Sequence, residues 1–175
     1  FEDYHGTLPE FKNLEFRVIP EGTNRLIELE TGGVDIAMDI TPNDVKKVEE
    51  NDKLKLFRTP DFGTLYMGIN TQKEQFSDPR VRQAIAHAID LEAIVEAVWK
   101  GVGNAASAPY TSTLKYSIAK DREPTEVDIA KAKQLLADAG YPDGFSCKIT
   151  TNERQERIDA ATIMKEDLKQ IGIDV

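Results

Sequence analysis

The sequence predicts an α/β fold in which mixed β-sheets are flanked by helices. Stretches that alternate apolar and polar residues are followed by stretches in which apolar residues recur every three or four positions. The predicted order is strand, helix, strand, helix, strand, strand, and then helix, helix, long loop, helix, strand, helix, strand. The opening strand–helix–strand unit favours a parallel pair with a right-handed crossover. With 175 residues, the chain can form one domain or two small ones.

The first 62 residues predict three strands and two helices. Apolar residues with β-branched or aromatic side chains indicate strands at 14–19, 34–38 and 54–57. Thr23 is expected to cap a helix that runs to Glu30. Thr41, followed by Pro42 and the acidic Asp44, has the composition of a second helix start.

The stretch 61–90 predicts a strand, a polar loop and a helix. The strand covers residues 63–70 and the loop residues 71–76. Asp78 is expected as the N-cap of the helix, with Pro79 at its first position. The core-facing side of this helix is then formed by apolar residues at helical spacing, namely Val81, Ala84, Ile85, Ala88 and Ile89.

The remaining residues predict three further helices and two further strands. A helix at 91–100 ends at Gly101, and a long irregular segment at 102–125 follows, of the kind that is usually functional or draped over the domain. An amphipathic helix at 127–139 precedes a strand at 145–149. The last helix, 154–171, turns Ile158, Ala161, Met164, Leu168 and Ile171 inward, and a strand begins at 173.

The composition excludes several classes of function. Hydrophobic residues make up 40% and charged residues 30%, and no run approaches the roughly 18 apolar residues of a membrane span. The formal charge of −9 argues against a nucleic-acid partner, because phosphate binding needs a basic surface. One cysteine and two histidines predict no internal disulfide, no metal cluster and no cofactor. Because the chain opens without an initiator Met and stops as a strand begins, we expect a piece of a longer protein.

Three motifs resemble one known family. The stretch NTQKEQFSDPRVRQAIAHAID begins at Asn70, KAKQLLADAGYPDG covers 131–144, and GVDIA covers 33–37. Together they resemble the family 5 extracellular solute-binding proteins, which are the oligopeptide-, dipeptide- and nickel-binding components of ABC importers. The resemblance covers essentially the whole chain.

The resemblance implies a partial fold of the periplasmic-binding-protein type II class. Residues 1–62 would be the C-terminal part of a first lobe and residues 63–175 the N-terminal part of a second. It implies a non-enzymatic protein, periplasmic or lipid-anchored outside the cell membrane, that captures a peptide or another small polar solute and delivers it to a membrane permease. A solute-sensing domain in a regulatory protein is the alternative, and a hydrolase using Asp35, Asp39 and His87 is a third class. The chain is also expected to self-associate through exposed sheet edges.

Two groups of residues are candidates for ligand binding. On the predicted strand at 63–70 and just before it, alternate residues share one face that either lines a cleft or is covered by a helix: Phe62, Thr64, Tyr66, Gly68 and Asn70. The second group, Thr151, Asn152 and Arg154, follows a strand at the end where ligands gather in open α/β sheets. There the alternative is that Asn152 caps a helix and Arg154 is solvated.

Other polar residues have structural interpretations. Arg80 and Arg82 follow Asp78 in the first turn of a helix and are interpreted as structural. His87 lies off the apolar face and is interpreted as a surface or partly packed residue rather than a base. The only tryptophan, Trp99, either belongs to the core or lines a cleft.

Overall fold

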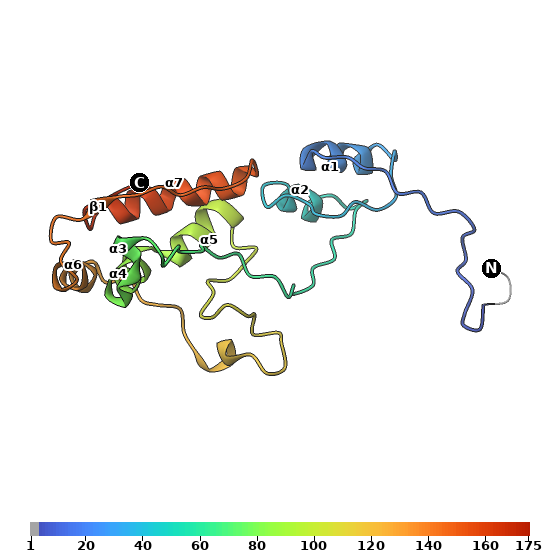
Figure 1. The fold of residues 1–175 in the computed structure, drawn as a ribbon. Helices are drawn as coiled ribbons and strands as arrows, with labels where there is room; N and C mark the ends of the chain where they lie inside the picture. The colour runs from blue at the N-terminus through green and yellow to red at the C-terminus, as the bar shows by residue number, and fades with distance from the viewer. Residues whose placement is uncertain (1–3) are drawn as a thin grey trace. The chain divides into compact units, whose positions relative to one another are not determined.

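The computed structural model describes residues 4–175 and divides into two compact units, Phe1–Leu56 and Phe57–Val175. The first unit contains helices α1 (Gly22–Glu30) and α2 (Val45–Glu49) (Figure 1). Leu26, Val45 and Val48 are its buried apolar residues, together with the buried acid Asp44. This small core leaves much of the unit's apolar surface exposed, including Phe16 and Val18.

The second unit is built on helices around one core. It contains α3 (Glu74–Ser77), α4 (Pro79–Ala88), α5 (Leu91–Trp99), α6 (Ile129–Asp138) and α7 (Gln155–Lys169), with a 3-10 turn at Ile118–Asp121. Helix α4 packs chiefly on α6, and α5 packs on α7 (Figure 1). Residues from all four of these helices meet in one hydrophobic cluster that includes Val81, Ile94, Leu136 and Leu168.

The start of α4 confirms the predicted N-cap, and two further helices of the second unit are capped in the same way. Asp78 accepts a hydrogen bond from the Arg80 N–H, with Pro79 in the first turn of α4. Asp90 accepts from the Ala93 N–H at α5, and Asp128 accepts from the Lys131 N–H at α6. Such caps satisfy backbone N–H groups that have no partner inside the helix. The apolar residues at helical spacing on α4 and α6 face the core as expected. On α7 the prediction is wrong at two positions, because Ile158 is 40% exposed and Ala160, in place of Ala161, is the buried alanine.

The helix starts of the first unit correct the predictions. Thr23 does not cap α1, because it lies inside the helix. Its hydroxyl donates to Asp44 Oδ2 at a distance of 3.4 Å. Thr41 does not cap α2 either, because its hydroxyl donates to Asp44 Oδ2 at 2.7 Å instead of accepting from a backbone N–H. Helix α2 therefore begins three residues later than expected, with Asp44 at its N-cap position.

Most of the predicted strands are wrong as secondary structure. Among residues 4–175, strands form only at β1 (Phe145–Ser146) and β2 (Ile173–Asp174), which pair in parallel with Phe145 opposite Ile173. Cys147 N–H extends the pairing by donating to Asp174 O at 2.8 Å. The segments 14–19, 34–38, 54–57 and 63–70 remain irregular backbone (Figure 1). A strand exists only when a neighbour completes its ladder of hydrogen bonds, so an alternating pattern alone does not produce one.

None of the helices formed by residues 4–175 has the length and apolar character that a bilayer crossing requires.

Candidate functional site

The segment that carries Tyr66 alternates between core and solvent. Met67 and Ile69 pack against the hydrophobic cluster, whereas Tyr66, Gly68 and Asn70 are exposed. Tyr66 is 80% exposed and therefore presents both its ring and its hydroxyl to solvent. The period of two that was expected of a strand is thus retained between 66 and 70, even though no ladder forms.

The start of this segment departs from the pattern. Phe62 is 68% exposed, as the predicted outer face requires, and Thr64 is half-buried. Leu65 was expected on the core side, but it is 50% exposed. The outer face therefore forms in full only from Tyr66 onward, where the opposite side chains reach the core.

A turn after the segment connects it to the rest of the unit. The Asn70 side-chain oxygen accepts a hydrogen bond from Gln72 N–H at 3.0 Å, and its carbonyl accepts from Lys73 N–H at 3.2 Å. Helix α3 follows, and the ring of Phe76 makes an edge-to-face contact with Phe145 of β1, with 5.6 Å between ring centroids. Asn70 thus has a structural role in this turn, and its side-chain oxygen is occupied there.

The second candidate group is exposed just before α7. Thr151, Asn152 and Arg154 all face solvent. The Asn152 side-chain oxygen accepts from Arg154 N–H at 3.3 Å, so Asn152 organises the turn, while Arg154 occupies the N-cap position without a side-chain capping bond. The guanidinium of Arg154 lies 3.8 Å from the Glu156 carboxylate, an exposed pair of small energetic weight.

Residues beside both candidate groups pack against the same hydrophobic core. Met67 and Ile69 support one group, and Cys147 and Ile149 support the other, all packed against the same hydrophobic cluster. None of the hydrogen bonds described among residues 4–175 joins the two groups directly. Two shallow hollows of about 370 and 350 Å³ lie elsewhere, between α5 and residues 123–127 and between α5 and residues 103–105. The predicted binding residues therefore lie on an open surface of this unit.

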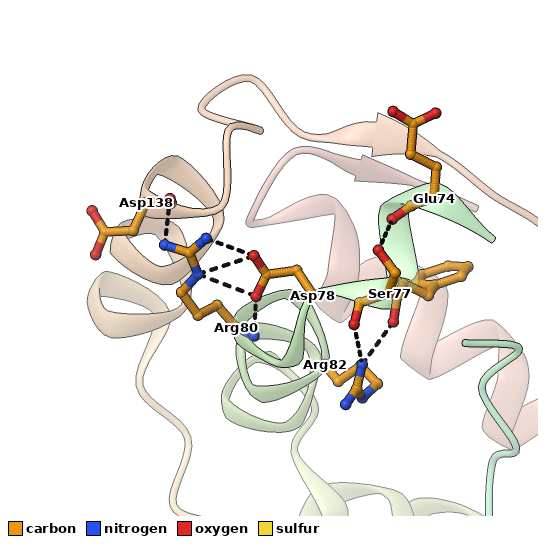
Figure 2. Close-up of polar contacts among 7 residues, drawn as sticks. Glu74, Ser77, Asp78, Arg80, Arg82 and Asp138 are labelled. Carbon is orange, nitrogen blue, oxygen red and sulfur yellow. Dashed lines mark hydrogen bonds and ion pairs between the residues drawn. The ribbon is translucent and has the colours of Figure 1, made fainter. Parts of the chain in front are cut away.

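Arg80 and Arg82 are structural, as predicted. Figure 2 shows the Arg80 guanidinium bound to the Asp78 carboxylate, with Nη2 and Oδ2 2.6 Å apart, while Nη1 donates to the Asp138 carbonyl at the end of α6. Arg82 Nη1 donates to the carbonyls of Phe76 and Ser77 at 2.8 and 3.0 Å. The bond from Arg80 lowers the pKa of Asp78. These arginines tie α4 to α6 and to the end of α3.

His87 also holds the backbone in place. Its Nδ1 lies 2.9 Å from the Glu126 carbonyl, which can only accept, so Nδ1 carries the proton. The His87 carbonyl accepts from Asp128 N–H, so this residue docks the segment that leads into α6. Trp99 packs partly buried against the core cluster. Residues 4–175 bring no three His, Cys, Asp or Glu side chains into a group that could hold a metal ion.

The arginine contacts of the first unit escaped the sequence-based predictions. Arg25 donates to four carbonyls, from Nη1 to Ile19 and Pro20 at 2.8 and 2.9 Å, from Nε to Met38 at 3.0 Å and from Nη2 to Asp39 at 2.7 Å. Arg17 binds Glu28 and the Gly33 carbonyl. These side chains hold together two segments that were expected to be joined by a sheet. No local pattern in the sequence identifies which arginine will bind distant carbonyls.

Comparisons with known proteins identify the family. The model of the bacterial extracellular solute-binding proteins, family 5 Middle, matches residues 1–175, and this protein belongs to that family. It is 30% identical to the glutathione-binding protein GsiB of Pectobacterium atrosepticum, over 96% of this chain and 32% of GsiB. It is 32% identical to the oligopeptide-binding protein AppA of Bacillus subtilis, over 99% of this chain and 34% of AppA.

A solved structure gives the same result for the fold. The ABC transporter-associated periplasmic binding protein DppA of Helicobacter pylori, in complex with the peptide STSA, matches with a TM-score of 0.78 and 31% identity. The match covers 91% of this chain and 31% of DppA. The predicted fold class, a partial α/β periplasmic-binding-protein fold, is therefore confirmed. The chain spans about a third of the length of the relatives that it matches.

Proposed function

We propose that this chain belongs to the substrate-binding component of an ABC importer, which captures peptides between two lobes outside the cytoplasm and delivers them to a membrane permease. Membership of the solute-binding family carries this proposal. Relatives named for oligopeptide and glutathione binding, and a DppA structure that holds a peptide, favour peptides as the solute class. The ABC transporter association of DppA supports delivery of the solute to a permease.

In this proposal residues 1–62 contribute to one lobe and residues 63–175 to the other. The division of the chain into compact units at 56/57 supports an organisation in two parts. Capture would consist of closure of two lobes, because a solute that binds the closed form better shifts the population toward it.

The outer face of the segment 62–70 is the proposed ligand-contacting surface of the second lobe. Tyr66 offers a ring that can cover apolar solute groups and a hydroxyl that can donate or accept a hydrogen bond. Gly68 leaves the backbone open, since a Cβ at this position would have no heavy atom within 4 Å. Thr151, Asn152 and Arg154 are the proposed contacts from the second segment.

Titration calorimetry with the full-length protein tests this proposal. A mixture of di- to nonapeptides should contain members that bind, and Tyr66→Ala should weaken the tightest of them at least tenfold, about 1.4 kcal/mol. Tyr116→Ala is the matched control, because Tyr116 is 89% exposed on the long loop and lies outside the proposed face. The control should bind as the wild type does. Absence of any peptide binding by the wild type would refute the peptide proposal.

Native mass spectrometry of the full-length protein from its own cells separates the solute classes. A ladder of added masses that match short peptides is expected. A single non-peptide mass would replace the solute and leave the binding role intact. Specific binding of operator DNA by the full-length protein would instead support the regulatory alternative.

A further inference from the structure

The segment 102–125, between α5 and α6, folds back on itself as a closed loop (Figure 1). Ser107 Oγ donates to the Ala119 carbonyl at 3.3 Å and so joins two positions that are 12 residues apart. Inside this closure, Ser117 Oγ donates to the Tyr110 carbonyl at 3.0 Å. Compact surface loops of about 6–16 residues that are held by their own side chains are often functional. The residues proposed to contact the solute leave this loop without a role.

The closed loop 107–119 reaches the backbone that leads into the proposed ligand-contacting surface. Thr113 Oγ1 donates to the Asp61 carbonyl at 3.4 Å, between residues that are 52 positions apart. The hydroxyls of Thr111 and Thr113 are also hydrogen-bonded to each other. Because a hydroxyl carries one proton and Thr113 uses its proton on Asp61, Thr111 is the donor to Thr113. The two threonines therefore form a relay that ends on Asp61, in which each hydrogen bond polarises the next.

Asp61 lies in a connector, residues 57–62, that runs from the end of the first unit at Leu56 to the start of the proposed ligand-contacting surface. The connector is exposed, irregular backbone. The Asp61 carboxylate accepts from the adjacent Phe62 N–H at 2.7 Å. Among residues 59–63, the hydrogen bond that comes from a distant part of the chain is the one from Thr113. Exposed backbone with few such bonds can absorb the dihedral changes that a hinge requires.

A restraint on this connector changes what lobe closure costs. A connector that is ordered before the solute arrives loses less conformational entropy on closure, so the affinity is higher. From the closed loop, the hydroxyl relay and the exposed connector, we infer that loop 107–119 is a strap that holds the connector at Asp61 ready for solute binding, with Thr113 as its positioning residue. This inference rests on the proposed capture of a solute between two lobes.

Removal of one hydroxyl tests the strap in the full-length protein. Thr113→Val removes the donor and keeps a β-branched side chain, whereas Thr113→Ser keeps the donor. The probe is the tightest-binding member of the di- to nonapeptide mixture, followed by titration calorimetry. Thr113→Val should weaken its binding about threefold to tenfold through a less favourable entropy, and Thr113→Ser should stay within about twofold of the wild type. Ser112→Ala is the matched control, because Ser112 is exposed between the two threonines and outside their relay.

Hydrogen exchange gives a readout of the strap that needs no solute. The Phe62 N–H, which is bonded to the Asp61 carboxylate, should exchange at least about threefold faster in Thr113→Val than in the wild type. Ser112→Ala should leave this rate unchanged. The Ala139 N–H at the end of α6 is bonded to the Leu135 carbonyl and should keep its wild-type rate in every variant. This amide distinguishes release of the strap from a general loss of stability.

The outcomes separate this inference from the function on which it rests. If the wild type binds peptides and Thr113→Val binds them with the wild-type affinity, the strap is overturned and the proposed function stands. An unchanged Phe62 exchange rate in Thr113→Val, or an equal loss of affinity in Ser112→Ala, would also overturn the strap. If the wild type binds none of the peptides, the proposed peptide function fails and the inference fails with it.

Discussion

Replacement of Asp44 by alanine is expected to open the α2 region of the first unit. Asp44 is 3% exposed, and its carboxylate accepts from the hydroxyl of Thr41 at 2.7 Å, the ammonium of Lys47 at 2.8 Å and the hydroxyl of Thr23 at 3.4 Å. Alanine leaves all three donors without this acceptor. The buried carboxylate is therefore the polar centre that joins α1, the turn at Thr41 and α2.

The magnitude follows from the exposure of each partner. A hydrogen bond to a charged group contributes about 1.5–3 kcal/mol, and the short bond from partly buried Thr41 falls in this range. The Lys47 side chain is 61% exposed, so its ion pair adds only about 0–1 kcal/mol. The long bond from Thr23 adds little. We expect a total of about 2–3 kcal/mol for Asp44→Ala.

Native-state hydrogen exchange of the full-length protein measures this loss. The Val48 and Glu50 amides, which are bonded to the Asp44 and Lys46 carbonyls, should exchange at least about 30-fold faster. Glu50→Ala is the matched control, because the Glu50 pair with Lys46 is 3.6 Å long and highly exposed on both sides. That control should change exchange less than threefold, which is about 0.6 kcal/mol. Similar effects of the two substitutions would refute the assignment of Asp44 as the buried polar centre.

The same residue predicts a pH dependence. The hydrogen bond from Lys47 is the main reason that the pKa of Asp44 lies below its ordinary value of 3.8. A lowered folded-state pKa means that the stabilisation is complete above the unfolded-state pKa and is lost as pH falls through the folded-state value. Protection of the α2 amides should thus decline on acidification below about pH 4. In Asp44→Asn this acid-dependent part should disappear.

Three further predictions concern the second unit. Burial and, to a smaller extent, repulsion from Asp90 raise the pKa of Asp167. Because the folded-state pKa is raised, the ionised carboxylate destabilises the fold as pH rises. Asp167→Asn should therefore have a higher melting temperature than the wild type at pH 7, and this difference should disappear at pH 3. Gly144→Ala should cost more than about 2 kcal/mol in chemical denaturation, because φ is +77° and a Cβ would collide with the Gly172 carbonyl. Leu136→Ala, at a side chain 1% exposed, should cost about 2–5 kcal/mol in the same assay.

Each of these three substitutions has a result, or a control variant, that would contradict the prediction. For Asp167, a lower melting temperature of the asparagine variant at pH 7 would show that the charge is needed. Gly140→Ala shares the strained φ but has nothing within 4 Å of its Cβ, so equal losses at 140 and 144 would rule out the collision. Leu135→Ala removes a partly buried neighbour on α6 and should cost clearly less than Leu136→Ala; a reversed order would contradict the assigned core face.

The sequence by itself determined the family and most of the helices, although α3 forms where a loop at 71–76 was predicted. Helix starts depend on neighbours within three residues, so Asp78 could be assigned as a cap from local composition. The alternation of core and solvent between Tyr66 and Asn70 was also readable, because side chains of extended backbone alternate whether or not a ladder forms. The three motifs predicted the solute-binding family before any fold was known.

Tertiary structure decided everything that depends on a distant partner. The segments at 14–19 and 34–38 have strand-like sequences, but in this chain the guanidinium of Arg25 joins their ends where a ladder was expected. Thr41 has the composition of a helix cap, yet the carboxylate of Asp44, buried against α1, takes its hydroxyl and moves the helix start. Hydrogen-bond partners are chosen by proximity in space, and a local pattern in the sequence carries no information about which distant group will arrive there.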